Sequence, residues 1–273
     1  MNPSLISRFW SVRSPWQAGV SPESEPIETQ TSAPSLRQFA DHGWQVQPGE
    51  VQVWCLNLDA VRVDEIGGLS DEEKARANRF RHRLDRQRFL ACRGILREML
   101  GRYLSREPGE LVFHYGANGK PELAGLPQEQ ALQFNVSHSG ELALYGFSTD
   151  AEIGVDIERV RTMGDMEEMA CMIFSHAEWR FWMTLPVSER PAAFFDCWTK
   201  KEAILKANGT GLACGMKSLT VLTGADNGID TSSVDLLTSF WAQDGWRAAL
   251  AAKRLKRGAR DEGRRGTIEL RIT

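Results

Sequence analysis

The sequence has no run of about 18 apolar residues, so it offers no candidate for a membrane-spanning helix. It contains only five cysteines among 273 residues, an odd number with no Cys-x-x-Cys pair. A disulfide framework and a zinc knuckle are therefore not expected, and a reducing, cytoplasmic setting fits best. Walker, HExxH and EF-hand spellings are missing, and Gly209-Thr210-Gly211 with Gly215 does not match GxGxxG. These absences exclude the commonest nucleotide and metal motifs.

An excess of charge of one sign is also missing. The formal net charge is −3, from 33 basic and 36 acidic residues. No overall basic field exists, so nucleic acid is not an expected partner and any polyanion must meet a local patch. Such a patch lies between Lys74 and Arg106, with seven arginines at 76, 79, 81, 83, 86, 88 and 93. Their forked donors suit phosphates, although arginines on a long helix can equally be solvated surface.

The order of elements predicts an α+β protein with two similar lobes. Residues 1–45 are rich in Ser, Pro, Glu and Thr and have no period, which predicts a flexible extension. The order strand, long helix, strands then occurs twice, in residues 46–152 and 153–255. Residues 256–273 form a basic tail.

Period and capping residues predict the individual elements. Strands are expected at 51–58, 111–115, 134–137, 142–147, 153–157, 220–222, 240–246 and 247–252. Ser70 with Glu73 has the spelling of a capping box and begins a long helix or a helix pair that ends near Gly101. Further helices are expected at 166–172, 177–185 and 191–207, the last ended by Asn208-Gly209.

Two carboxylates stand at spacing two in Gly154-Val155-Asp156-Ile157-Glu158. On a strand they share one face, and a cation or protonation must relieve their repulsion. Carboxylate oxygens completed by phosphate and water are what Mg²⁺ prefers. An edge strand with two solvated acids is the alternative, but the flanking Ile153, Val155 and Ile157 favour a strand whose other face is buried.

The second motif is Trp198-Thr199-Lys200-Lys201-Glu202-Ala203-Ile204-Leu205-Lys206. On a helix, Trp198, Glu202 and Lys206 share one face. Glu202 is a candidate metal ligand or general base, and Lys206 can neutralise a phosphate. The alternative is a surface Glu–Lys pair worth a few tenths of a kcal/mol.

Two turns add phosphate-binding candidates. Ser137 and His138 lie where a strand enters a small polar turn, and backbone amides there can bind phosphate oxygens. Lys120 beside the rigid Pro121 suits the phosphate or base of a nucleotide. A serine hydrolase is not favoured, because adjacent residues on a strand point in opposite directions and no orienting acid is placed.

Taken together, these motifs resemble the signatures of the 4′-phosphopantetheinyl transferases, and the chain is similar in size and motif order to the surfactin-synthetase-activating type. The resemblance covers roughly residues 50 to 252. It rests on Gly154–Glu158, Trp198-xx-Lys201-Glu202-Ala203-xx-Lys206, the arginine-rich helix, Gly119-Lys120-Pro121 and Phe134–Gly140, all in the family's order.

The resemblance implies two lobes related by pseudo-two-fold symmetry, with the active site in the cleft between them. It implies Mg²⁺-dependent transfer of the phosphopantetheine arm of coenzyme A to a serine of an acyl or peptidyl carrier protein, releasing adenosine 3′,5′-bisphosphate. By the family pattern Asp156, Glu158 and Glu202 bind Mg²⁺, and Glu202 and Lys206 are catalytic. The coenzyme A contacts would be Arg76, Arg88, Lys120, Pro121, Ser137, His138 and Lys201. A cytoplasmic monomer is expected.

The sequence departs from the family near the 3′-phosphate site. Glu72 and Glu73 stand where lysines are frequent, and Phe89 stands where a small hydroxyl residue can occur. Two other functions remain open: another Mg²⁺ phosphotransferase or hydrolase acting on nucleotides, and a coenzyme A or carrier-binding module without catalysis. Which carrier the protein would serve cannot be read from the residues.

Overall fold

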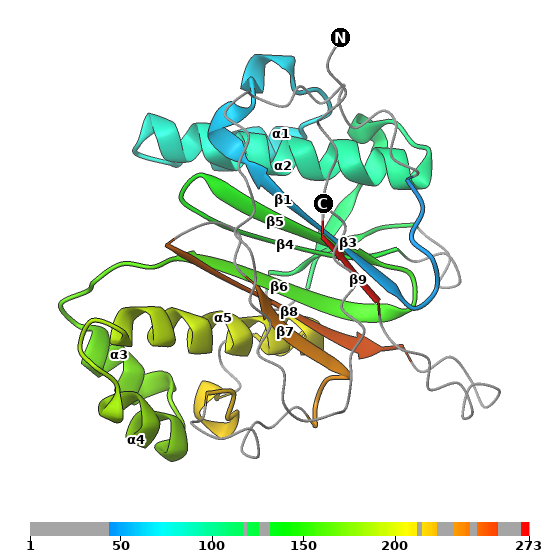
Figure 1. Ribbon diagram of the computed structural model, residues 1–273. Coiled ribbons are helices and arrows are strands. Elements are labelled where there is room, and N and C mark those ends of the chain that lie inside the picture. The colour runs from blue at the N-terminus through cyan, green and yellow to red at the C-terminus, as the bar shows by residue number, and fades with distance from the viewer. Residues whose placement is uncertain are drawn as a thin grey trace, which may run out of the picture.

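A computed structural model describes residues 44–116, 119–125, 132–211, 215–222, 232–240, 245–255 and 269–272. The elements stack as four layers, with one long helix on each outer side and two sheets between them (Figure 1). Each lobe is therefore a long helix packed on the outer face of its own sheet. The predicted α+β fold of two similar lobes is confirmed.

The first lobe holds a sheet in the order β4-β5-β1-β9. Its strands are β1 Glu50–Asn57, β4 Gln133–Ser139, β5 Leu142–Ser148 and β9 Glu269–Ile272, with a separate hairpin of β2 Phe113–Tyr115 and β3 Pro121–Leu123. Its helices are α1 Asp71–Ala77 and α2 Arg83–Leu104, with the short turns η2 Leu58–Ala60, η3 Val63–Glu65 and η4 Pro108–Glu110. Apolar residues of α2, among them Ile95 and Leu96, pack on Trp54, Tyr145 and Phe147 to form the core of this lobe.

The second lobe holds a sheet in the order β6-β8-β7. Its elements are β6 Ala151–Arg159, α3 Met166–Ile173, α4 His176–Thr184, α5 Arg190–Asn208, η7 Met216–Ser218, β7 Leu236–Phe240 and β8 Trp246–Arg254. Helix α5 packs on β6 and β8, and Phe194, Cys197, Ile204 and Trp182 belong to its core.

A third apolar cluster joins the two sheets. Val51, Val53 and Leu144 from the first sheet meet Val155 and Leu250 from the second. Strand β4 runs beside β6, and the side chain of Asn135 on β4 accepts a hydrogen bond from the backbone amide of Val155 on β6 at 2.9 Å. The lobes thus meet along a seam between β4 and β6, and this seam positions the candidate site.

Most predicted elements are confirmed. Ser70 and Glu73 form the expected capping box of α1, and Gly209 caps α5 in the left-handed region at φ 67°. The predicted long helix is a pair, because the chain leaves helical geometry between α1 and α2.

Two predicted strands are wrong. Among the described residues, 220–222 pair with no strand, and the amide of Val221 donates to the buried carboxylate of Glu178 at 2.7 Å. Residues 240–246 are not one strand: Phe240 ends β7 and Trp246 begins β8, and 241–244 lie outside the described residues.

The chain's ends were predicted as an extension and a basic tail. Within residues 256–273 the strand β9 pairs with β1 in parallel, from Glu50↔Glu269 to Val53↔Ile272. Of the predicted extension, residues 1–43 lie outside the described part. No described helix is long and apolar enough to cross a membrane.

Candidate active site

The two acids of β6 share one face of the strand, as their spacing predicts, and this face lies toward α5. Val155 and Ile157 are fully buried between the sheets, so Gly154, Asp156 and Glu158 occupy the opposite face. A Cβ built on Gly154 would lie 2.1 Å from the carbonyl oxygen of Ala203 and 2.5 Å from the amide nitrogen of Ala207. Glycine at this position therefore lets the backbone of α5 lie directly against β6. That contact brings the α5 side chains to Asp156.

Lys206 reaches across from α5 to the acid pair. Its Nζ donates to Asp156 Oδ1 at 2.7 Å, to the Val155 carbonyl at 3.1 Å and to Ser137 Oγ at 3.2 Å. The Lys206 side chain is about a quarter exposed, while Asp156 is almost fully buried. Lys206 therefore presents a partly accessible positive charge at the seam between the lobes.

Strand β4 supplies polar partners for the two acids, and of these the sequence indicated only Ser137, as a phosphate ligand. Ser139 Oγ donates to Glu158 Oε2 at 2.8 Å, as Ser137 Oγ does to Asp156 Oδ1 at the same distance. Asn135, Ser137 and Ser139 stand at spacing two, which places all three side chains on one face of the strand. This spacing of polar residues is the feature of the sequence from which their shared face could have been predicted. It identifies the serines as the groups that orient the acids.

Among the acids of the site, Glu202 has the most strongly raised pKa. Its Oε1 and the Oδ2 of Asp156 are buried without a hydrogen-bond partner. Burial, reinforced by the charge of Asp156, raises the pKa of Glu202 to about 7, and burial likewise raises the pKa of Glu158. Two carboxylate oxygens without partners, next to further acids, are suitable ligands for a cation, whose charge would compensate theirs.

The protein's own acids do not complete a metal centre. Within the described residues, no group of three His, Cys, Asp or Glu side chains is placed to hold an ion by itself. Glu158 already has protein partners: it accepts a hydrogen bond from Ser139 Oγ, and the Arg161 guanidinium lies 3.5 Å from its carboxylate. The donor set therefore fits an ion such as Mg²⁺ that takes one or two carboxylates and completes its shell with substrate phosphates and water.

Basic residues of the first lobe converge on His138. Partial desolvation, together with the positive charges of Lys206, Arg76 and Arg88, lowers the pKa of this imidazole. Arg88 is held by Asp59 through two hydrogen bonds of 2.6 and 2.7 Å, and Arg76 lies over the ring of Phe89 at 5.4 Å. The four predicted phosphate-binding residues Arg76, Arg88, Ser137 and His138 therefore border one positive region beside the acids.

Lys120 crosses from the first lobe to the second. It precedes Pro121, the first residue of β3, and its Nζ donates to the carbonyls of Lys206 at 3.1 Å and Ile153 at 3.4 Å. Burial lowers the pKa of its ammonium. Lys120 and Pro121 thus lie next to the C-terminal part of α5 and form a wall of the seam.

Lys201 does not lie where the resemblance implies. Its side chain is fully buried on the other side of α5 and donates to Glu178 Oε2 at 2.6 Å and to the carbonyls of Ile173 and Met216, both at 2.8 Å. The Lys201 side chain is 0% exposed, so coenzyme A cannot reach its ammonium. The prediction of a coenzyme A contact is wrong, because the buried partners of α3, α4 and η7 capture this lysine.

Glu73 explains one departure from the family pattern. It accepts from Arg93 Nε at 2.8 Å and Arg97 Nε at 2.6 Å, and all three side chains are buried. This residue therefore joins α1 to α2 and is not directed at a ligand.

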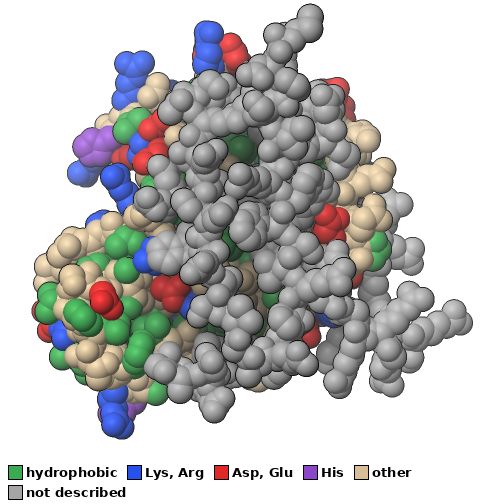
Figure 2. Space-filling model, in the orientation of Figure 1, with side chains coloured by type: hydrophobic (Ala, Val, Ile, Leu, Met, Phe, Trp, Pro, Cys, Tyr) green, Lys and Arg blue, Asp and Glu red, His purple; other side chains and the backbone are tan. Residues whose placement is uncertain are grey.

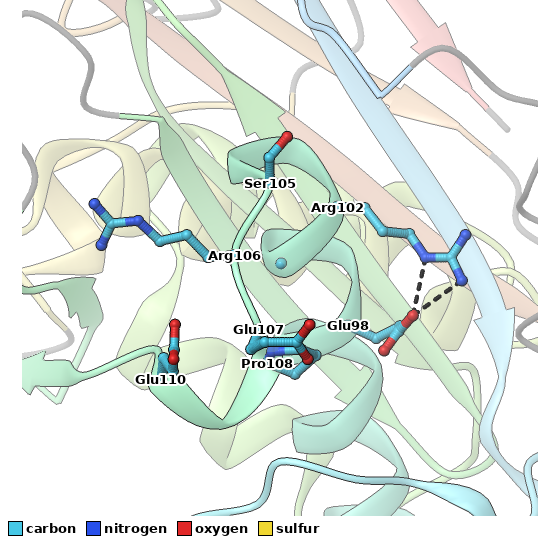
Figure 3. A pocket seen from close by; sticks show the side chains of 8 residues that line it. Glu98, Arg102, Ser105, Arg106, Glu107, Pro108 and Glu110 are labelled. Carbon is cyan, nitrogen blue, oxygen red and sulfur yellow. Dashed lines mark hydrogen bonds and ion pairs between the residues drawn. The ribbon is translucent and has the colours of Figure 1, made fainter.

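A hollow elsewhere in the molecule does not belong to the site. It lies at the C-terminal end of α2 and is lined by Glu98, Gly101, Arg102, Ser105, Arg106, Glu107, Pro108 and Glu110 (Figure 3). Its lining mixes both charges, with Arg102 paired to Glu98 at 2.9 Å, and includes none of the residues that converge on the seam.

Comparisons with known proteins place the chain in a family. Residues 152–251 match the family described as the 4′-phosphopantetheinyl transferase superfamily, and residues 63–148 match the N-terminal domain of 4′-phosphopantetheinyl transferases. The chain is 41% identical over 182 residues to the 4′-phosphopantetheinyl transferase HetI of Nostoc sp. (strain PCC 7120), covering 63% of this chain and 77% of that protein. The chain belongs to the 4′-phosphopantetheinyl transferase family. It is accordingly a transferase.

Two further relatives extend the comparison of this transferase. A putative 4′-phosphopantetheinyl transferase of Synechocystis sp. is 37% identical over 62% of this chain and 68% of that protein. The 4′-phosphopantetheinyl transferase Sfp of Bacillus subtilis is 26% identical over 67% and 82%. Among solved structures, the holo-[acyl-carrier-protein] synthase of Thermotoga maritima is similar, with a TM-score of 0.30 at 21% identity over 40% of this chain and 66% of that chain.

The raised pKa of Glu202 predicts a pH-dependent stability. Because the pKa in the fold, about 7, exceeds the usual 4.5, the ionised form is disfavoured by folding. The stability due to this group is present below pH 4.5 and is lost as the pH rises through 7. With a chelator present, Glu202→Gln should therefore melt above the wild type at pH 8, and the gap should close toward pH 4.5. The control is Glu168→Gln, an exposed acid on α3; an equal gap at both pH values would contradict the assignment.

The buried Lys201–Glu178 pair predicts a large loss of stability. Lys201→Met leaves the Glu178 carboxylate buried without its cation, which should lower the free energy of unfolding by about 3 kcal/mol or more. Chemical denaturation measures this. The neighbouring Lys200→Met is a matched control, because Lys200 is paired with Asp196 at a partly exposed position and should cost well under about 1 kcal/mol. A Lys201→Met protein of unchanged stability that binds coenzyme A weakly would restore the ligand role.

Proposed function

We propose that this protein transfers the 4′-phosphopantetheine arm of coenzyme A to a serine of an acyl or peptidyl carrier protein, with Mg²⁺ bound, and releases adenosine 3′,5′-bisphosphate. Family membership supports the use of coenzyme A and action on carrier proteins. The observation that carries the proposal is the convergence of Asp156, Glu202 and Lys206 beside Ser137 and His138, which lie near the end of β4. The seam thus holds carboxylates that can bind a cation, a candidate base, and groups that can donate hydrogen bonds to phosphate.

The reaction exchanges one phosphorus–oxygen bond for another. The serine Oγ of the carrier attacks the phosphorus that bears the pantetheine oxygen, and the bond from that phosphorus to the bridging oxygen breaks. The electron pair of the broken bond leaves with adenosine 3′,5′-bisphosphate. The serine proton passes to Glu202, directly or through a water. Glu202 is the candidate base because burial and the neighbouring acids raise its affinity for a proton in the metal-free protein.

The acids would bind the metal, and the hydrogen-bond donors would bind the pyrophosphate. Asp156 and Glu202, each with a buried carboxylate oxygen that lacks a hydrogen-bond partner, would hold Mg²⁺ together with substrate phosphate and water, with Glu158 beside them as the third acid. The ion would neutralise charge on the pyrophosphate. Lys206 donates to the oxygens on which negative charge grows as the bridging bond breaks. Ser137 and His138 hold the pyrophosphate.

The nucleotide half of coenzyme A would lie toward the first lobe. Lys120 and Pro121 flank the adenine nucleotide, and Arg76 and Arg88 lie near its 3′-phosphate. Arg88 stays oriented by Asp59 while it does so. The similarity to Sfp supports assignment to the surfactin-synthetase-activating type, for which we expect a monomer.

Mass spectrometry of carriers tests the proposal. Apo-carriers of fatty-acid, polyketide and peptide type are incubated with the protein, coenzyme A and Mg²⁺. A gain of one phosphopantetheine group on a serine, with adenosine 3′,5′-bisphosphate in the supernatant, is the expected result, and a chelator should prevent it. Cleavage of coenzyme A without a carrier would indicate a hydrolase. Binding without turnover on every carrier would indicate a module that only binds.

A further inference from the structure

The connection from α1 to α2 presents arginines around two exposed apolar side chains. We name it the arginine patch and define it as Arg79, Phe80, Arg81, Arg83, Leu84 and Arg86. Phe80 is 39% exposed, although its ring packs against that of Phe89 with the centroids 5.2 Å apart, and Leu84 is 47% exposed. Lys, Arg and His side chains gather at this end of α2, at the upper left of the space-filling view (Figure 2).

The charge of the arginine patch is not balanced by the protein. Its four arginines form no ion pair within the described residues, whereas Arg88, Arg93 and Arg97 are all paired with acids. Asp85 is the sole acid among residues 78–88, although the whole chain has a net charge of −3. The surplus positive charge is therefore local, and it is available to a partner.

The fold itself does not require these arginines. Arg83 and Arg86 lie in the first turn of α2, where the helix dipole favours acids and disfavours cations. By contrast, the first turn of α1 holds Asp71, Glu72 and Glu73 and a capping box, while α2 has no side-chain cap. Basic residues at this end thus lower helix stability slightly, and something other than folding must account for them.

The arginine patch adjoins the candidate active site. Arg76 precedes it and Arg88 follows it, and the charges of both act on His138. A carrier domain of about 80–100 residues has a radius of gyration near 13 Å, so one that delivers a serine to the seam also covers neighbouring surface. From this we infer that the arginine patch docks the carrier protein, through an acidic surface whose apolar centre meets Phe80 and Leu84. The inference rests on the proposed function.

Charge reversal separates this role from coenzyme A binding. Arg79→Glu/Arg83→Glu should raise KM for an apo-acyl carrier protein that the wild type modifies, and lower kcat/KM about tenfold or more at low salt. The KM for coenzyme A at saturating carrier should stay within about twofold, and the salt dependence of carrier binding should weaken. The melting temperature should change little, because an acid at position 83 suits the first turn of α2 and Arg79 forms no ion pair with a described residue. Leu84→Ala should weaken carrier binding without changing its salt dependence.

Arg106→Glu is the matched control. This exposed arginine lies beyond the other end of α2, about 30 Å away, and its reversal should leave both KM values unchanged. A raised KM for coenzyme A in the Arg79→Glu/Arg83→Glu protein, with carrier KM unchanged, would assign the patch to the nucleotide and overturn the inference. Unchanged values for both substrates would also overturn it. If no carrier is modified by the wild type, the proposed function has failed first.

Discussion

Glu202→Gln is expected to lower kcat for carrier modification by about 10³-fold or more while the fold is retained. The amide keeps the volume and one oxygen of the carboxylate but can neither accept the serine proton nor compensate a cation. Labelling of a carrier with fluorescent coenzyme A measures the loss. A melting curve of the Glu202→Gln protein in the Mg²⁺-containing assay buffer separates loss of activity from unfolding.

Asp156→Asn should lower kcat in the same way, and it should also weaken the hold on the Lys206 ammonium. That lysine loses its charged partner at 2.7 Å and remains next to the Val155 carbonyl and Ser137. Glu168→Gln again serves as the control, since its carboxylate is exposed on α3. Full labelling by the Glu202→Gln or Asp156→Asn protein would remove the acids from the mechanism.

Gly154→Ala should disrupt both the fold and the site. One added methyl group would meet the Ala203 carbonyl oxygen at 2.1 Å and the Ala207 amide at 2.5 Å, and backbone atoms cannot rotate away. Overpacking of this kind costs about 1–3 kcal/mol and sometimes more. Since α5 carries Glu202 and Lys206, its displacement from β6 should also reduce transfer more than the loss of stability alone.

The measurements are chemical denaturation and kcat at a temperature where the variant is fully folded. Gly164→Ala provides the control, because a Cβ there has nothing within 4 Å. If Gly154→Ala unfolds at the denaturant concentration of the wild type and retains its kcat, α5 does not depend on this contact. The role assigned to Gly154 would then be wrong.

The local elements could be predicted because they depend on short-range patterns. The alternation of Ile153, Val155 and Ile157 correctly predicts a buried face of β6, and Asn208-Gly209 correctly predicts the end of α5. Long-range pairing could not be predicted in this way. Strand β9 adds to β1 from more than two hundred residues away, and residues 220–222 lose strand pairing to a glutamate side chain.

Lys201 and Lys206 show where the sequence alone reaches its limit. The sequence by itself determined the acid spacing on β6, the helical register of Glu202 and Lys206, and the family to which those motifs are similar, because these depend on the period of a single strand or helix. Only the tertiary structure decided which lysine faces the acids. Lys206 lies at the seam against Asp156, whereas Lys201, one residue before Glu202, turns into a core built by Glu178, Ile173 and Met216. The direction of each depends on what the rest of the chain packs against α5, and that is a property of the assembled fold.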